Sequence, residues 1–370
     1  YYAPPSGYLA LCTQNLATEL SPTIDDGSEY FNTILWTGNG SNPRSLTGVG
    51  FQPDWLWTKA RNSAFGHNVY DSSRGDDGTA YYRLETQDTA SEIAQPPAGH
   101  VTSLDSDGFS VTNGSSSDNI VNNSGTTYVA WNWKANGGTT SSNSDGTITS
   151  TVQANTTAGF SIVTRTGTGA NATVGHGLGV APSMIISKNR DLGTGDWVVY
   201  HSGIGATKYL QLNQNVGTGT SAIAWNNTEP TSSVFSVGTW DSGNGSGNNI
   251  VSYCFAEIEE YSKMGTYTGN GNTDGTFVYT GFRPSWIMLK RTDGDADWIV
   301  FDSKRLGYNG DNKRLYPNRT FAEDTTGFDL LSNGFKARMT GSTINGSGNS
   351  YIYMAFAENP FVTSGAVPVT

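Results

Sequence analysis

The sequence predicts an all-β protein made of three tandem homologous β-sandwich-like repeats in an elongated chain. Three observations favour this class. Aromatic residues form 12% of the 370 residues and Gly contributes 46 of them, a mixture that suits strands joined by tight turns. Short apolar runs alternate with turn-rich stretches, and long helical periodicity is absent. The third observation is an internal repeat.

One strand-like motif occurs three times. "GFQPDWLWTKAR" begins at Gly50, "GVAPSMIISKNR" at Gly179 and "GFRPSWIMLKR" at Gly281. In each copy a Pro leads into mostly apolar positions that end in a Lys. Thirteen residues before each Pro lies the last Gly of a Thr-Gly-x-Gly turn, without a gap in any copy. The fixed spacing indicates a repeated unit rather than compositional bias. The residues concerned are Pro53, Pro182 and Pro284, followed by Lys59, Lys188 and Lys290.

Two further motifs follow in the same order. An aromatic strand reads "HNVYDS" from His67, "WVVYHS" from Trp197 and "WIVFDS" from Trp298. A closing run reads "YVAWNWKA", "IVSYCFAE" and "YIYMAFAE". The closing runs are apolar on both faces, so we expect central strands that are covered on both sides or packed against a neighbouring copy.

These matches predict the domain boundaries. The copies span residues 28–146, 147–262 and 263–361, and "NGGTTSSNSDG" is the clearest linker. The first copy carries an insertion near residues 76–100. Residues 1–27 form an N-terminal junction segment and residues 362–370 a C-terminal tail. A start at Tyr1 rather than Met suggests a processed product or the ordered part of a longer chain.

The recurring residues are expected to be structural. The prolines suit strand entry, where no ladder donor is needed. The lysines, with Arg61, Arg190 and Arg291 nearby, are expected to finish their strands at the solvent edge. Cys254 shares its aligned position with Asn132 and Ala355, which predicts a small, buried and inert side chain.

Composition and motifs argue against several function classes. A net charge of −11 disfavours nucleic-acid binding, which needs a surplus of Lys and Arg. Two cysteines are too few for a disulfide framework or a structural zinc site. No apolar run reaches the length of a membrane helix and no signal peptide opens the chain. We therefore expect no nucleic-acid partner and no membrane insertion.

Catalytic and metal motifs are also missing. "DGDAD" from Asp293 begins like a calcium loop, but Trp298 and Lys304 stand where an EF-type loop needs Gly and Glu. The four histidines lie far apart without metal-ligand spacing. The sequence therefore predicts no catalytic, metal or cofactor site and no enzyme activity. Carboxylates brought together by the fold leave a polysaccharide depolymerase open as an alternative.

Two tryptophans are the candidate binding residues. Trp225 and Trp240 lie in turn-rich stretches and have no aromatic counterpart in the aligned copies. An exposed indole stacks on a sugar face, and neighbouring Asn, Asp and Ser side chains can bond to its hydroxyls. The sequence predicts a glycan-binding surface here. The alternative is that each indole packs against its own sheet.

Long motifs carry a resemblance to a known family. "PPSGYLALCTQNL", "GSEYFNTILWTGNGSNPRSLTGVGFQPD", "GANATVGHGLGVAPSMIISKNRD" and "YIYMAFAENPF" resemble the C-terminal region of large tail or fibre proteins of tailed phages of the marine phage and prophage type. In that family a SPRY-like domain normally precedes the first motif, and none is present here. The resemblance implies a virion protein and supplies no catalytic residues.

The expected function is therefore non-enzymatic host attachment by a tail fibre or receptor-binding protein on the particle surface. Its expected partners are other virion proteins, copies of itself in a trimer, and a host-surface glycan or protein. A purely structural virion part, such as a capsid decoration, head fibre or tail ornament, is the first alternative. The depolymerase is the second.

Overall fold

The computed structural model describes residues 23–93, 99–115, 120–305 and 309–357. The regular secondary structure of the described chain is almost entirely antiparallel β-strand, which confirms the all-β class. Within it the helices are single turns: η3 (Gly27–Glu29), α1 (Ala222–Trp225) and α2 (Asp241–Asn244). Most of the predicted junction segment, the predicted tail and part of the predicted insertion lie outside the described residues.

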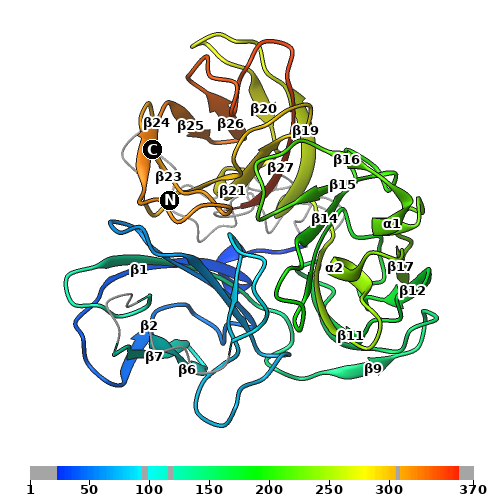
Figure 1. Ribbon diagram of the computed structural model, residues 1–370. Coiled ribbons are helices and arrows are strands. Elements are labelled where there is room, and N and C mark those ends of the chain that lie inside the picture. The colour runs from blue at the N-terminus through cyan, green and yellow to red at the C-terminus, as the bar shows by residue number, and fades with distance from the viewer. Residues whose placement is uncertain (1–22, 94–98, 116–119, 306–308, 358–370) are drawn as a thin grey trace, which may run out of the picture.

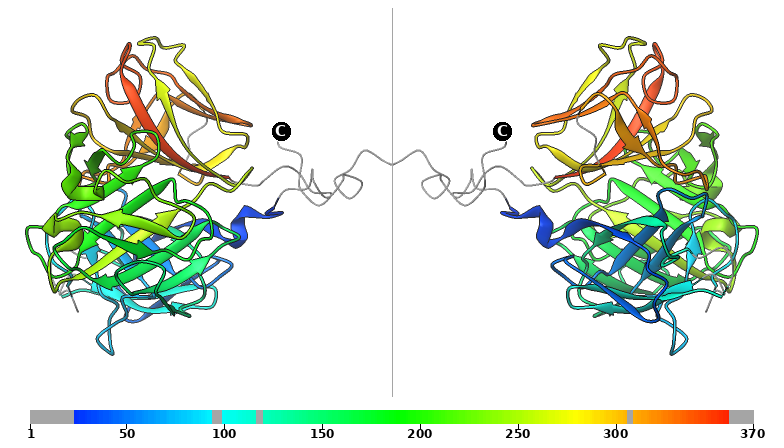
Figure 2. Two further views of the ribbon diagram at one scale, coloured as in Figure 1. Left: turned by 90° about the vertical axis from the view of Figure 1, so that its right-hand side faces the viewer. Right: turned by 90° about the vertical axis from the view of Figure 1, so that its left-hand side faces the viewer.

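Three lobes surround a common centre in Figure 1, coloured blue to cyan, green, and yellow to red along the chain. We call the lobe containing β1–β8 the first lobe, that containing β9–β18 the second, and that containing β19–β27 the third. Each lobe has one principal antiparallel sheet. Figure 2 shows η3 and the start of β1, in dark blue, at one face of the molecule.

The principal sheets have five, eight and four strands. In the first lobe the strand order is β1 (Phe31–Thr37), β8 (Thr127–Trp133), β3 (Trp55–Ala60), β4 (His67–Asp71) and β5 (Leu84–Glu85). In the second it is β16 (Gly219–Thr220), β15 (Lys208–Gln211), β14 (Trp197–His201), β13 (Met184–Asn189), β18 (Asn249–Phe255), β11 (Phe160–Thr166), β10 (Ser150–Asn155) and β9 (Ser141–Asn143). In the third it is β19 (Ser262–Thr268), β27 (Ser350–Ala357), β21 (Pro284–Arg291) and β22 (Ile299–Asp302).

The three sheets share one order around the closing run. In each, the closing strand lies between an early strand and the strand that ends in the recurring Lys, and the aromatic strand follows. The register is also shared: the three lysines lie opposite the second residue of the closing run. The pairs are Lys59 with Val129, Lys188 with Val251, and Lys290 with Ile352. Each predicted Pro lies at or just before its strand, as expected.

A smaller sheet covers the outer face of each principal sheet. The strands are β2 (Arg44–Thr47), β7 (Gly108–Asn113) and β6 (Gly99–Asp105); β12 (Ala172–Gly175) and β17 (Val234–Val237); and β20 (Phe277–Tyr279), β26 (Gly334–Ala337) and β25 (Phe328–Leu331). A further pair in the third lobe, β23 (Asn312–Arg314) and β24 (Asp324–Thr326), lies beside β22. The first and second lobes thus each enclose an outer core of their own.

The inner faces of the principal sheets form one shared core. Trp55 of the first lobe stacks on Tyr253 of the second, with ring centroids 4.7 Å apart. Trp133 meets Trp286 of the third lobe edge to face at 5.3 Å. The expectation of an elongated chain is therefore wrong. Aromatic side chains on the inner faces carry so much apolar surface that they are buried most effectively between lobes.

The closing strands are buried on both faces, which confirms that expectation. On β8, Tyr128 and Ala130 belong to the outer core, whereas Trp131 and Trp133 belong to the shared core. The predicted linker at 136–146 is more ordered than expected, because it contains β9 and because Asp54 accepts hydrogen bonds from the N–H groups of Ala135, Gly137 and Gly138.

Candidate functional site at the seam between lobes

Three seams separate the lobes. We call the boundary between the first and second lobes the first seam, that between the second and third the second seam, and that between the third and first the third seam. One backbone hydrogen bond recurs at each, from a loop N–H to the carbonyl two residues after the recurring Lys. The donors and acceptors are Glu92 to Arg190 at 2.7 Å, Thr218 to Thr292 at 2.9 Å, and Glu323 to Arg61 at 2.7 Å.

The recurring lysines lie inside the seams. All three are fully buried, so the expectation that they finish their strands in solvent is wrong. The strand end is interior because the neighbouring lobe covers it. Lys188 Nζ donates to the carbonyls of Thr89 and Gly195, both at 2.9 Å, and Lys290 Nζ donates to Asn215 at 3.2 Å. Burial lowers the pKa of Lys59 to about 7 and those of Lys188 and Lys290 to about 8.

The first and third seams contain matching ionic networks. At the first seam Arg74 pairs with Asp71 and with Glu92, the latter at 2.6 Å, and Glu92 in turn pairs with Arg190 at 2.7 Å. The Arg74 side chain is completely buried.

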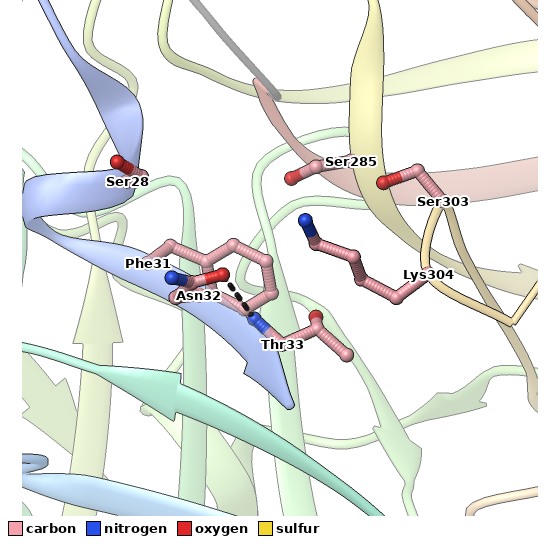
Figure 3. Close-up of a pocket in the computed structure, with 7 residues that line it drawn as sticks. All are labelled: Ser28, Phe31, Asn32, Thr33, Ser285, Ser303 and Lys304. Carbon is pink, nitrogen blue, oxygen red and sulfur yellow. Dashed lines mark hydrogen bonds between the residues drawn. The ribbon is translucent and has the colours of Figure 1, made fainter. Parts of the chain in front are cut away.

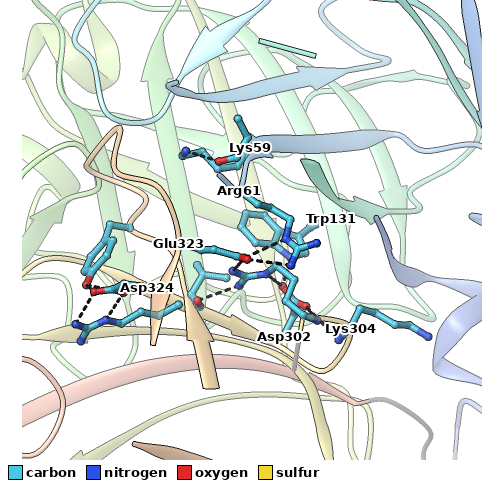
Figure 4. A network of polar contacts seen from close by, with 12 residues as sticks. Lys59, Arg61, Trp131, Asp302, Lys304, Glu323 and Asp324 are labelled. Atoms are coloured by element: carbon cyan, nitrogen blue, oxygen red, sulfur yellow. Dashed lines mark hydrogen bonds and ion pairs between the residues drawn. The ribbon is translucent and has the colours of Figure 1, made fainter. Parts of the chain in front are cut away.

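At the third seam Arg305 pairs with Asp302 at 2.5 Å and with Glu323 at 3.4 Å. Glu323 pairs with Arg61 at 2.9 Å. Figure 4 shows this network with Trp131, whose indole N–H donates to Asp302 at 2.9 Å. At the first seam the Tyr253 hydroxyl plays the same part for Asp71 at 2.6 Å.

The second seam lacks this network. His201 and Ile204 stand where the other seams have Asp and Arg, and Thr218 and Thr292 stand where they have Glu and Arg. His201 Nε2 lies 3.1 Å from the carbonyl of Tyr353, while its Nδ1 accepts the Gly203 N–H at 3.0 Å. Burial lowers the His201 pKa to about 4, so the ring is neutral.

A groove of about 460 Å³ opens at the second seam. Its lining comes from β15 and from two loops, one of each lobe: Tyr209, Gln211, Val216, Gly217, Thr218, Gly219, Thr292, Asp293, Gly294 and Asp295. The loops touch so closely that a Cβ on Gly217 would lie 2.9 Å from the Thr292 carbonyl oxygen. The groove therefore combines one aromatic ring with threonine, amide and carboxylate groups over a close backbone contact.

The two candidate tryptophans differ in position. Trp225 is only 3% exposed and packs edge to face against Tyr200 in the outer core of the second lobe. The expectation of an exposed indole is therefore wrong for Trp225, because the short turn α1 folds it onto the sheet. Trp240 is half-buried and meets the Tyr209 ring edge to face at 4.8 Å. It supports a residue that lines the groove.

Tyr209 and Asp295 line the same groove, which the sequence does not predict. They lie in different lobes, and the residue pattern of the "DGDAD" stretch bears only on a calcium loop. Asp293 does form turn contacts, accepting from Arg291 at 2.7 Å and from the Ser350 N–H at 3.1 Å. Sequence order gave no signal that this turn faces Tyr209, since only the seam brings them together.

A second pocket has an acidic lining. It measures about 470 Å³ and lies beside the start of β19, between Glu257, Glu259, Glu260, Ser262, Lys263, Tyr279, Thr280 and Gly281. Burial raises the pKa of Glu260, and the Glu259 carboxylate adds to this rise. Tyr279 is 62% exposed.

Other candidate groups are held in structural positions. Cys254 is fully buried, as expected, and burial raises its thiol pKa to about 12. Burial also lowers the pKa values of His67 and His176. Across the described ranges, no group of three or more His, Cys, Asp or Glu side chains is arranged to hold a metal ion.

The fold and the groove define a three-lobed all-β protein with a candidate ligand site between two lobes. The family model described as "Domain of unknown function (DUF7483)" matches residues 26–360, and the chain belongs to this family. No curated protein matches the sequence. None of the helices in the described part of the chain is long and apolar enough to span a membrane.

Proposed function

We propose that the chain is a non-enzymatic virion protein of a tailed phage, of the tail-fibre or receptor-binding type, that attaches the particle to a host-surface glycan. We also propose that its lobes are homologous tandem repeats. The shared strand order, the register of the lysines and the backbone bond at every seam support this homology. The phage assignment rests on the resemblance of the long motifs to tail and fibre proteins.

The groove at the second seam is the observation that carries the binding proposal. Tyr209 offers a half-buried ring on which a sugar face can stack, and Gln211, Thr218 and Asp295 offer polar groups for hydroxyls. The shared aromatic core holds both walls in place, which suits loops that must present a fixed surface. A shallow site of this kind gives weak single-site affinity, so display as a trimer together with other virion proteins strengthens attachment.

Alanine substitutions at Tyr209 and Trp240 test this function. The assay measures binding to host cells and melting temperature together. Tyr209→Ala is expected to abolish binding, and Trp240→Ala to weaken it by loosening the Tyr209 ring. Both should lower the melting temperature by a similar, modest amount, because both rings pack on the outer core. Phe321→Ala is the matched control, because it removes an exposed aromatic side chain that lines neither the groove nor the acidic pocket. Unchanged binding by Tyr209→Ala would refute the groove as the attachment site.

The acidic pocket supports a second candidate function, cleavage of the same polysaccharide. A glutamate with a raised pKa beside another carboxylate is the arrangement a glycosidase uses. Release of reducing ends by the purified protein, lost in both Glu259→Gln and Glu260→Gln, would establish a depolymerase. The non-enzymatic proposal predicts no release by any of the three proteins.

A further inference from the structure

A pocket of about 310 Å³ lies at the third seam, away from the groove. Its walls come from η3 and β1 of the first lobe and from β21 and the turn after β22 of the third: Ser28, Phe31, Asn32, Thr33, Ser285, Ser303 and Lys304. Figure 3 shows the Lys304 ammonium extending toward Ser285 and Ser303, with the Thr33 hydroxyl facing the same space. One cation and several hydroxyl groups thus converge on one volume.

The corresponding place at the first seam is filled by the protein itself. There Ser72 and Ser73 follow Asp71, just as Ser303 and Lys304 follow Asp302. The buried amide of Gln153, from β10, donates to the Ser72 and Ser73 hydroxyls at 2.9 and 2.8 Å. The first seam therefore shows that this place accommodates a polar group that bonds to both residues after the aspartate.

The third seam has no such group among the described residues. β1 is the edge of its sheet, whereas β10 and β9 continue the sheet in the second lobe. Thr33 is only 6% exposed, yet its Oγ1 has no hydrogen-bond partner in the described chain. A buried hydroxyl without a partner is unfavourable, and a ligand that bonds to it would recover part of that cost.

We propose that this pocket binds a sugar that carries one carboxylate, with the carboxylate on Lys304 and sugar hydroxyls on Thr33 and Ser303. The single lysine matches one negative charge, and the net charge of −11 disfavours polyanions. This site is separate from the groove, so a negative result here leaves the proposal for the groove unaffected.

The test uses the full chain with D-glucuronate as the probe, D-glucose as its uncharged counterpart, and inorganic phosphate. Binding is measured by ligand-observed NMR. Glucuronate is expected to bind at least about tenfold more tightly than glucose, since the bond to Lys304 is charge-assisted. Equal binding of the two sugars, no binding of either, or tighter binding of phosphate than of glucuronate would overturn the proposal.

Variants locate the site. Lys304→Met is expected to reduce glucuronate affinity about tenfold and Thr33→Val about threefold, reflecting a charged and a neutral hydrogen bond. Lys208→Met removes an exposed lysine of the second lobe and serves as the matched control. Thr33→Val should not lower the melting temperature, because the lost hydroxyl has no partner in the described chain. Undiminished binding by Lys304→Met, or an equal loss in Lys208→Met, would contradict the assignment.

Discussion

The first and third seams are held by buried ions, whereas the second seam is held by a neutral histidine and leaves an open groove. All three share the same backbone bond and a buried lysine. The difference lies in four side-chain positions: Asp, Arg, Glu and Arg at the ionic seams become His201, Ile204, Thr218 and Thr292. Removing the long charged pair leaves room for a ligand. One set of backbone contacts thus supports both ionic seams and a neutral one.

The largest expected effect comes from breaking an ionic seam. Arg74→Met leaves Asp71 and Glu92 in the seam without their buried cation. Loss of one partner of a buried ion pair costs about 3–5 kcal/mol, to be measured by chemical denaturation. The matched change at the second seam, Ile204→Met, should cost less than about 1.5 kcal/mol because it conserves apolar volume. Equal costs would show that the seams do not differ in how they are stabilised.

Acid should weaken the second seam through His201. Its folded pKa of about 4 lies below the ordinary value of 6.5, so the unfolded chain binds the proton first as pH falls. The stability present above pH 6.5 is therefore lost progressively toward pH 4, by on the order of 3 kcal/mol. His201→Asn removes this titration while keeping a polar side chain.

The pH experiment compares the free energies of unfolding of the wild type and His201→Asn between pH 7 and pH 4. His67 and His176 contribute the same sign of dependence in both proteins, since their pKa values are also lowered. The difference between the two curves should shrink as pH falls. Parallel curves would mean that His201 does not titrate in this window.

The smallest expected effect comes from converting the open seam into an ionic one. Thr218→Glu with Thr292→Arg places the pair where Glu92 meets Arg190 and Glu323 meets Arg61. A partly exposed pair adds about 0.5–1 kcal/mol, which a double-mutant cycle measures. The same change should fill the groove and abolish the glycan binding proposed for it. Retained binding would show that the proposed site does not depend on the neutral side chains of this seam.

The sequence predicted the strands and the order in which they repeat from lobe to lobe. It did not predict how the lobes pack against one another. The Pro and Lys positions mark the same strand in each lobe, since backbone register must be kept for the sheet to form. Periodicity could not show that one face of that strand packs on a neighbouring lobe. Lys59, Lys188 and Lys290 were therefore placed in solvent, although neighbouring carbonyls bind them in the interior.

A short sequence pattern marks the two ionic seams. Asp-Ser-x-Arg follows the aromatic strand at Asp71 and again at Asp302, but not at His201. Buried arginine in two copies and its absence from the third predict one seam of a different kind. The partners Glu92 and Glu323 could not be read from order along the chain, because each lies on a loop that reaches the next lobe. The proximity of Tyr209 and Asp295 could not be predicted either, because they also lie in different lobes.

The attachment proposal is tested most directly by a density map of the tailed-phage particle in which it places this chain. The proposal predicts that the chain lies at the outer surface, on a tail or fibre, with the groove between Tyr209 and Asp295 facing solvent and free of other virion proteins. A chain whose three lobes all pack against virion subunits, with that groove covered, would contradict attachment and favour a purely structural part.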